Sequence, residues 1–189
     1  DRLELDDAPL LLAPTPDALP GAVEEVQHLA ARMPGAQVLI GPAATLDALA
    51  DGLRPGRHVH LACHGRFRTD APFASDVQLA DGWTSASTLA SLPWTDTTVV
   101  LSACAVGRSA ALGGERAGMA RALLGAGARA VVVAKWDVPD DLTGHLLSDA
   151  YDAAISGSPV SAALQRAQRA AAATGAHPVG WAAFEVMHR

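Results

Sequence analysis

The sequence predicts an α/β protein, a three-layer α/β/α sandwich with a mostly parallel central sheet. Short apolar runs of strand length alternate with amphipathic helical patterns along the chain. Strands that alternate with helices form parallel sheets whose two faces the connecting helices cover. No repeat or linker interrupts the series, and 189 residues are enough for one sizeable core. We therefore expect residues 1–189 to form a single domain.

The first half of the chain contains three predicted strands and two predicted helices. The first helix places its apolar side chains on one face, namely Val23, Val26, Ala30 and Met33. Thr45 is a good cap for the second helix, which Asp51 and Gly52 end. In chain order we expect a strand at 9–13, a helix at 22–33, a strand at 37–40, a short helix at 45–49 and a strand at 58–63.

The second half repeats the alternation. Met119 and Leu123 keep helical spacing, and Gly125 and Gly127 end that helix before the next strand. The expected elements are a weak helix at 85–92, a strand at 97–101, a helix at 115–124, a strand at 129–134, helices that open at Asp140 or Asp141 and at Ser161, and an apolar end at 181–187.

Composition excludes several functional classes. Half of the residues are hydrophobic and 18% are charged, which excludes a disordered chain. The net charge of −6 disfavours nucleic acid and anionic membranes as partners. No apolar run reaches the length of a membrane-spanning helix, and two cysteines indicate thiols in a reducing compartment, so we expect a cytoplasmic location. Because the chain starts at Asp1, we expect a fragment of a longer protein.

Two of the predicted strands end in residues that could perform chemistry. One strand runs into His64 and Gly65, and another ends just before Cys104. The carboxyl ends of parallel strands meet at one edge of a sheet, where ligands gather. If these two strands are neighbours, His64 and Cys104 face each other there.

When a thiol lies beside an imidazole, the thiol can act as a nucleophile and the imidazole as its base. His64 can accept the proton of Cys104, and the backbone N–H groups of Gly65 and Cys104 can stabilise an oxyanion. The residues alone leave an alternative open, because free cysteines are often buried packing residues and a strand-end histidine can bond a backbone carbonyl.

Several short segments follow one another along the chain in a characteristic order. They are HLACHG at 60–65, LSAC at 101–104 with Gly107, GGERAG at 113–118, ALLGAGARAVV at 122–132, WDVPD at 136–140, ALQRA at 163–167, and HP at 177–178 with WAAF at 181–184. In sequence, order and spacing, these segments resemble the CHAT family of caspase-like cysteine peptidases. The resemblance spans residues 22–184, nearly the whole chain.

The resemblance implies a caspase-like fold with Cys104 as nucleophile and His64 as base, no cofactor, and a protein substrate whose peptide bond is cleaved. It also implies upstream helical repeats of the TPR kind. Ala105 and Val106 depart from a polar pair common in the family, and Lys135 from an apolar position. These departures leave substrate preference open, as do two other functions: a non-catalytic scaffold and a thiol hydrolase of small esters or amides.

The remaining polar residues have competing interpretations. Asp140 resembles the acidic residue that separases present to a basic side chain before the scissile bond, but it could equally cap a helix. Cys63 should pack in the core, on the face opposite His64, and Glu115 should favour a helix N-terminus. No metal is expected, because His58, His60 and His64 share a face without a second ligand cluster. Trp136, Trp181 and Phe184 are expected in the core or in a groove wall.

Overall fold

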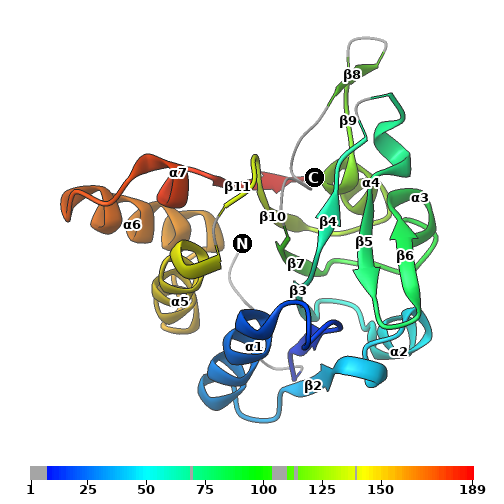
Figure 1. Ribbon diagram of the computed structural model, residues 1–189, viewed down its shortest axis with the longest axis horizontal. Coiled ribbons are helices and arrows are strands. Elements are labelled where there is room, and N and C mark those ends of the chain that lie inside the picture. The colour runs from blue at the N-terminus through cyan, green and yellow to red at the C-terminus, as the bar shows by residue number, and fades with distance from the viewer. Residues whose placement is uncertain (1–7, 69, 104–109, 113–114, 139) are drawn as a thin grey trace.

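The computed structural model describes residues 8–68, 70–103, 110–112, 115–138 and 140–189 (Figure 1). Its main feature is a six-stranded sheet with the order β11-β10-β7-β3-β1-β2. All neighbouring pairs are parallel except β10 and β11, which are antiparallel. The strands are β1 (Leu10–Ala13), β2 (Gln37–Ile40), β3 (His58–Ala62), β7 (Thr98–Ser102), β10 (Ala130–Ala134) and β11 (Phe184–His188). The predicted α/β class with a mostly parallel sheet is confirmed.

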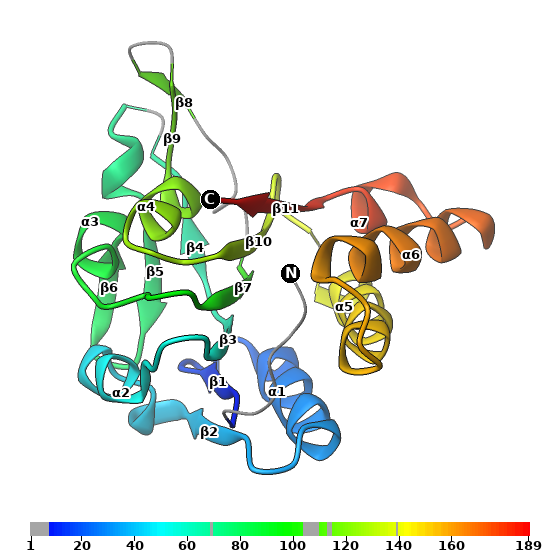
Figure 2. The same cartoon turned by 180° about the vertical axis from the view of Figure 1, so that it is seen from behind.

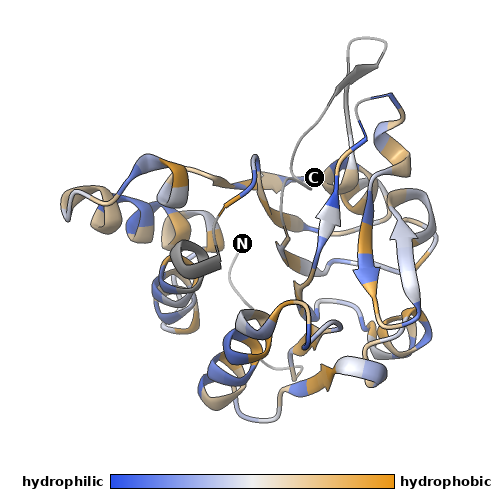
Figure 3. Cartoon of the chain, viewed as in Figure 1, coloured by the Kyte–Doolittle hydropathy of each residue, from blue (hydrophilic) through white to orange (hydrophobic). Residues whose placement is uncertain are grey.

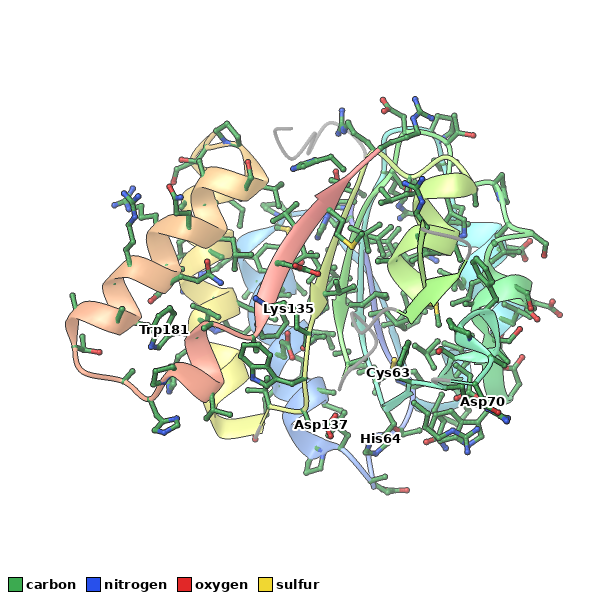
Figure 4. All side chains as sticks on the ribbon, turned by 90° about the horizontal axis from the view of Figure 1, so that it is seen from above. Cys63, His64, Asp70, Lys135, Asp137 and Trp181 are labelled. Carbon is green, nitrogen blue, oxygen red and sulfur yellow. The ribbon has the colours of Figure 1, made fainter. Side chains whose placement is uncertain are left out.

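Helices cover both faces of this sheet, as Figures 2 and 4 show from behind and from above. One face carries α1 (Pro20–Arg32), α5 (Asp140–Ile155) and α6 (Val160–Ala173), and α7 (Pro178–Trp181) precedes β11. The other face carries α2 (Leu46–Gly52), α3 (Ala86–Leu89) and α4 (Met119–Gly125). Two separate apolar clusters, one on each side of the sheet, therefore form the core.

Strand alternation decides which cluster each residue of β3 joins. Val59, Leu61 and the following Cys63 pack in the cluster with α2, α3 and α4. His58 and His60 point to the opposite face, toward α5, where both reach Tyr151. Cys63 is 2% exposed, so the prediction that it packs in the core is confirmed. Figure 3 shows the apolar residues along the central strands.

Helix α1 is amphipathic, and its buried face extends beyond the predicted one. Ala22, Val26, Leu29 and Met33 are buried, whereas Val23 and Ala30 are only partly covered. All four predicted residues lie in or against the same apolar cluster, so the predicted face is confirmed, but the most deeply buried residues extend toward Ala22 and Leu29. This extension matters because it brings Glu25 toward the sheet.

Two small antiparallel units were not predicted. A three-stranded sheet contains β4 (Gly65–Arg66), β5 (Asp76–Leu79) and β6 (Gly82–Ser85). One 3-10 turn, η2 (Pro72–Ala74), lies between β4 and β5, and another, η1 (Gly41–Ala43), follows β2. A two-stranded unit contains β8 (Ala110–Leu112) and β9 (Glu115–Ala117).

The strand β9 corrects the helix that the sequence predicted from residue 115. Residues 115–117 pair with β8, and the helix α4 begins only at Met119. Gly118 separates the two elements with a φ of 151°, far from the helical region. Glu115 therefore lies in a strand and not at a helix N-terminus. Among the described residues, no helix is long and apolar enough to cross a membrane.

Candidate functional site

The two strands singled out by the sequence are direct neighbours. β3 and β7 pair in parallel, with Ala62 opposite Ser102, and the Cys63 N–H donates to the Ser102 carbonyl at 3.2 Å. His64 follows β3 and Ala103 follows β7, so both lie at the same edge of the sheet (Figure 4). Cys104 comes next in the chain and lies outside the described residues. The condition for a Cys104–His64 pair, neighbouring strands, is thus met.

The main chain at His64 is held by the small antiparallel sheet. The Gln78 N–H donates to the His64 carbonyl at 2.9 Å, and Gly65 begins β4, where it pairs with Val77. His64 is partly exposed. This arrangement places the partly exposed His64 at a defined point of the sheet edge, beside the backbone of Gly65.

A cavity of about 740 Å³ opens beside His64. Its walls come from α1, α5 and the ends of β3 and β7, and they include Ser102 and Ala103. Leu19, Leu147 and Phe184 make part of the wall apolar. A cavity of this size can bury one large side chain of a bound peptide together with its neighbours.

Asp140 is the first residue of α5, as the sequence predicted, but its side chain lies outside the described part of the structure. Two other residues of the same segment are placed. Val138 is buried and lines the cavity, and the Trp136 Nε1–H donates to the Val179 carbonyl at 2.8 Å. The carboxyl end of β10, Val138 and the described part of α5 from His145 to Ser148 therefore border the cavity. Phe184 is a wall residue too, which confirms the prediction made for it.

A buried polar chain runs from the cavity into the core. The Ser102 hydroxyl donates to Glu25 Oε2 at 3.1 Å, and Glu25 Oε1 lies 3.1 Å from His60 Nε2. His60 Nδ1 lies 2.8 Å from the Tyr151 hydroxyl, which lies 2.8 Å from His58 Nε2 as well. The chain joins α1, β7, β3 and α5 through side chains alone.

Burial determines the protonation states of His58 and Tyr151, the two innermost residues of this polar chain. Burial, followed by the charge of the nearby His60, lowers the pKa of His58 from 6.5 to about 3. Burial, followed by the charge of Glu25, raises the pKa of Tyr151 well above 10. Near neutral pH His58 is therefore an uncharged imidazole and Tyr151 an intact phenol.

Glu25, Ser102 and Tyr151 were not identified from the sequence. A signal for Glu25 was present, because it lies three residues after Ala22 and four before Leu29, on the face of α1 that turned out to be buried. An acidic residue on a buried helical face needs a partner. The partners lie far away in sequence, so only the fold reveals them.

The structure holds no candidate metal centre within the residues it describes: no group of three or more histidine, cysteine or acidic side chains is suited to a metal ion. His58 and His60 instead bond a phenol hydroxyl. Their predicted common face is correct.

Comparisons with known proteins agree with this geometry. The crystal structure of the Saccharomyces cerevisiae separase–securin complex at 3.0 Å resolution is similar to this chain with a TM-score of 0.69 and 15% identity, over 98% of this chain and 12% of that one. The same complex at 2.6 Å resolution gives a TM-score of 0.64 at 15% identity, over 96% and 12%. The chain thus spans about an eighth of the length of these neighbours, and the likeness shows the fold. No curated protein matches the sequence. The model of the CHAT domain matches residues 6–189, and the chain therefore belongs to the CHAT domain family.

Proposed function

We propose that this chain is a cysteine endopeptidase domain that hydrolyses a peptide bond in a protein substrate, with Cys104 as nucleophile and His64 as its base. The observation that carries the proposal is the parallel pairing of β3 and β7, which brings His64 and the residues that lead to Cys104 to one sheet edge. The cavity beside His64 supplies a place for a substrate side chain. Membership of the CHAT domain family and the separase-like fold support the same class.

In the proposed reaction, the Cys104 thiol loses its proton to His64, and the sulfur attacks the carbonyl carbon of the scissile bond. The negative charge on the carbonyl oxygen is stabilised by the N–H groups of Gly65 and Cys104. His64 then protonates the leaving amine as the carbon–nitrogen bond breaks. Water, deprotonated by His64, hydrolyses the thioester and releases the free thiol and the new carboxyl end. No cofactor enters these steps.

Asp140 is proposed to bind a basic side chain on the residue before the scissile bond. It stands at the start of α5, an element that borders the cavity. A carboxylate there would select arginine or lysine over aspartate or leucine. Comparison of peptides with Arg, Asp and Leu at that position tests this, and a preference for Asp or Leu would exclude it.

The proposed function is tested by two substitutions and one labelling reaction. Cys104→Ala should abolish cleavage of casein or a peptide library, and His64→Ala should lower it by at least about 100-fold. His177→Asn is the matched control, because His177 accepts the Val179 N–H as a helix cap and asparagine keeps that function. Cleavage by the Cys104→Ala variant would refute the proposal.

Labelling with iodoacetamide distinguishes a peptidase from a non-catalytic domain with the same fold. In a peptidase, Cys104 should alkylate faster than free cysteine, and the rate should fall in His64→Ala. Mass spectrometry distinguishes it from the buried Cys63. If Cys104 alkylates no faster than free cysteine and its rate is the same in His64→Ala, the chain would instead be a non-catalytic interaction domain. A reactive thiol that turns over only small esters would indicate a thiol hydrolase.

A further inference from the structure

The buried polar chain of Glu25, His60, Tyr151 and His58 needs an explanation that packing does not supply. Side chains of His58 and His60 are 1% and 0% exposed, and Glu25 is only 13% exposed. Burying such groups is unfavourable, and apolar residues of the same volume would often stabilise the fold as well or better. Polar groups in such a setting are best explained by the atoms that they hold in place.

The outer end of the chain holds Ser102, the last residue of β7. Ser102 makes two hydrogen bonds. Its hydroxyl donates to Glu25 Oε2 at 3.1 Å, and its carbonyl accepts from the Cys63 N–H at 3.2 Å. One contact comes from α1 and the other from the residue beside His64. Ser102 is also two positions before Cys104, so little chain separates the held residue from the proposed nucleophile.

The inner end of the chain places a second side chain against Glu25. Its second oxygen, Oε1, faces His60 Nε2 at 3.1 Å, and His60 is held in turn by the Tyr151 hydroxyl at 2.8 Å. Tyr151 comes from the C-terminal half of α5 and is 4% exposed. The carboxylate that accepts from Ser102 thus also lies close to a buried imidazole, although this second contact lacks hydrogen-bond geometry.

We propose that Glu25 is a positioning residue, which acts through Ser102 to fix the carboxyl end of β7 and with it the main chain that carries Cys104. The inference rests on the proposed function for its kinetic consequence. Hydrogen bonds to a charged acceptor are the stronger ones, and small displacements of a reacting group lower rates by up to about 100-fold. Glu25 and Ser102 also line the cavity, so the test must separate positioning from substrate binding.

The kinetic test compares variants that keep or remove the Ser102 contact. Glu25→Leu and Ser102→Ala should each lower kcat by about 10- to 100-fold and change KM by less than about threefold. Glu25→Gln keeps an oxygen that accepts from Ser102 and should recover kcat to within about fivefold of the wild type. The double variant of Glu25→Leu with Ser102→Ala should be no slower than Glu25→Leu, since both changes break one contact.

The control is Gln27→Leu, a polar-to-apolar change of similar size on the exposed side of the same helix. It should leave kcat and KM unchanged. Ser102→Ala removes a single oxygen, so it keeps the test decisive if Glu25→Leu does not fold. Additive losses in the double variant would overturn the proposal. So would a loss in Glu25→Gln confined to peptides with a cationic side chain, which would make Glu25 a binding residue instead.

Hydrogen exchange separates this proposal from the proposed function. In a Cys104→Ala background, which cannot cleave, the amide of Cys63 reports on the end of β7 because it donates to the Ser102 carbonyl. Ser102→Ala should accelerate its exchange by about tenfold or more, while the amides of β10 stay protected. An unchanged Cys63 rate would overturn the positioning role even in an active enzyme. Absence of any Cys104-dependent cleavage would refute the peptidase and leave the exchange result standing.

Discussion

His58 should make the folded state sensitive to mild acid. It lies in the first position of β3, 1% exposed, and burial, followed by the charge of His60, lowers its pKa from 6.5 to about 3. In the unfolded chain the same imidazole keeps its ordinary pKa near 6.5. Between these two values the unfolded state binds a proton that the folded state does not, so the free energy of unfolding falls as the pH falls.

The magnitude follows from the width of that window. Each pH unit below 6.5 lowers the free energy of unfolding by about 1.4 kcal/mol for one such group. At pH 5 the contribution of His58 is therefore about −2 kcal/mol relative to pH 7.5, and the loss continues until the pH approaches the folded pKa of about 3. A domain stabilised by about 5 to 15 kcal/mol would lose a large share of its stability.

The assay is urea denaturation at pH 7.5 and pH 5.0, followed by far-UV circular dichroism. His58→Gln removes the titrating group and keeps a side chain that can bond the Tyr151 hydroxyl. Its free energy of unfolding should fall between the two pH values by about 2 kcal/mol less than that of the wild type. His145→Gln, at an exposed position of α5, is the matched control and should behave like the wild type.

Two results would refute the reasoning. One is an equal pH dependence of stability in His58→Gln and the wild type. The other is direct: the imidazole C–H resonance of His58 in the folded protein should show no titration step above pH 5, and a midpoint near 6.5 would contradict the burial argument.

Three further substitutions should destabilise the fold, as measured by urea denaturation at pH 7.5. Gly52→Ala should cost about 1 to 3 kcal/mol, because an added Cβ would lie 2.7 Å from Leu10 Cδ2, which belongs to a fully buried side chain. Trp94→Phe should cost about 1 to 3 kcal/mol, since the buried indole N–H donates to the Leu89 carbonyl at 2.6 Å. Tyr151→Phe should cost about 1 to 3 kcal/mol, because it removes the hydroxyl between two buried imidazoles.

Two of these expectations have a control variant, and the third has an outcome that would contradict it. Gly21→Ala adds a Cβ in α1 where nothing lies within 4 Å, so it should not destabilise the fold, and equal losses at both glycines would contradict the steric argument. Trp83→Phe is the control for Trp94→Phe. Trp83 is 41% exposed, so this change should destabilise the fold less than Trp94→Phe does. A Tyr151→Phe variant as stable as the wild type would show that its hydroxyl does not stabilise the fold.

Most of the central sheet could be predicted because its strands are short apolar runs without competing patterns. The predicted strand at 37–40 coincides with β2, and the Thr45 cap is present, with its side chain accepting the Ala48 N–H at 3.1 Å. The small strands β4, β5 and β6 could not be recognised in the same way. They are only two to four residues long, contain few apolar residues, and are stabilised by pairing with each other.

At the candidate functional site, too, some features could be predicted from the sequence and others could not. His64 and Gly65 could be singled out because a parallel sheet places strand ends at one edge, and the pairing of β3 with β7 places them there. The roles of Cys104, Asp140 and the oxyanion groups stay predictions, since Cys104 and the side chain of Asp140 fall outside the described residues.

The order of apolar runs and helical patterns by itself determined the layers of this protein and the ends of β3 and β7, the first of which leads into His64. Such patterns are local, and each can be recognised from a few neighbouring residues. Only the tertiary structure decided that Glu25 turns inward, that Ser102 is held between α1 and Cys63, and that Tyr151 joins both histidines of β3. Those contacts join residues up to 93 positions apart, and the rotation of a helix and the register of two strands select them.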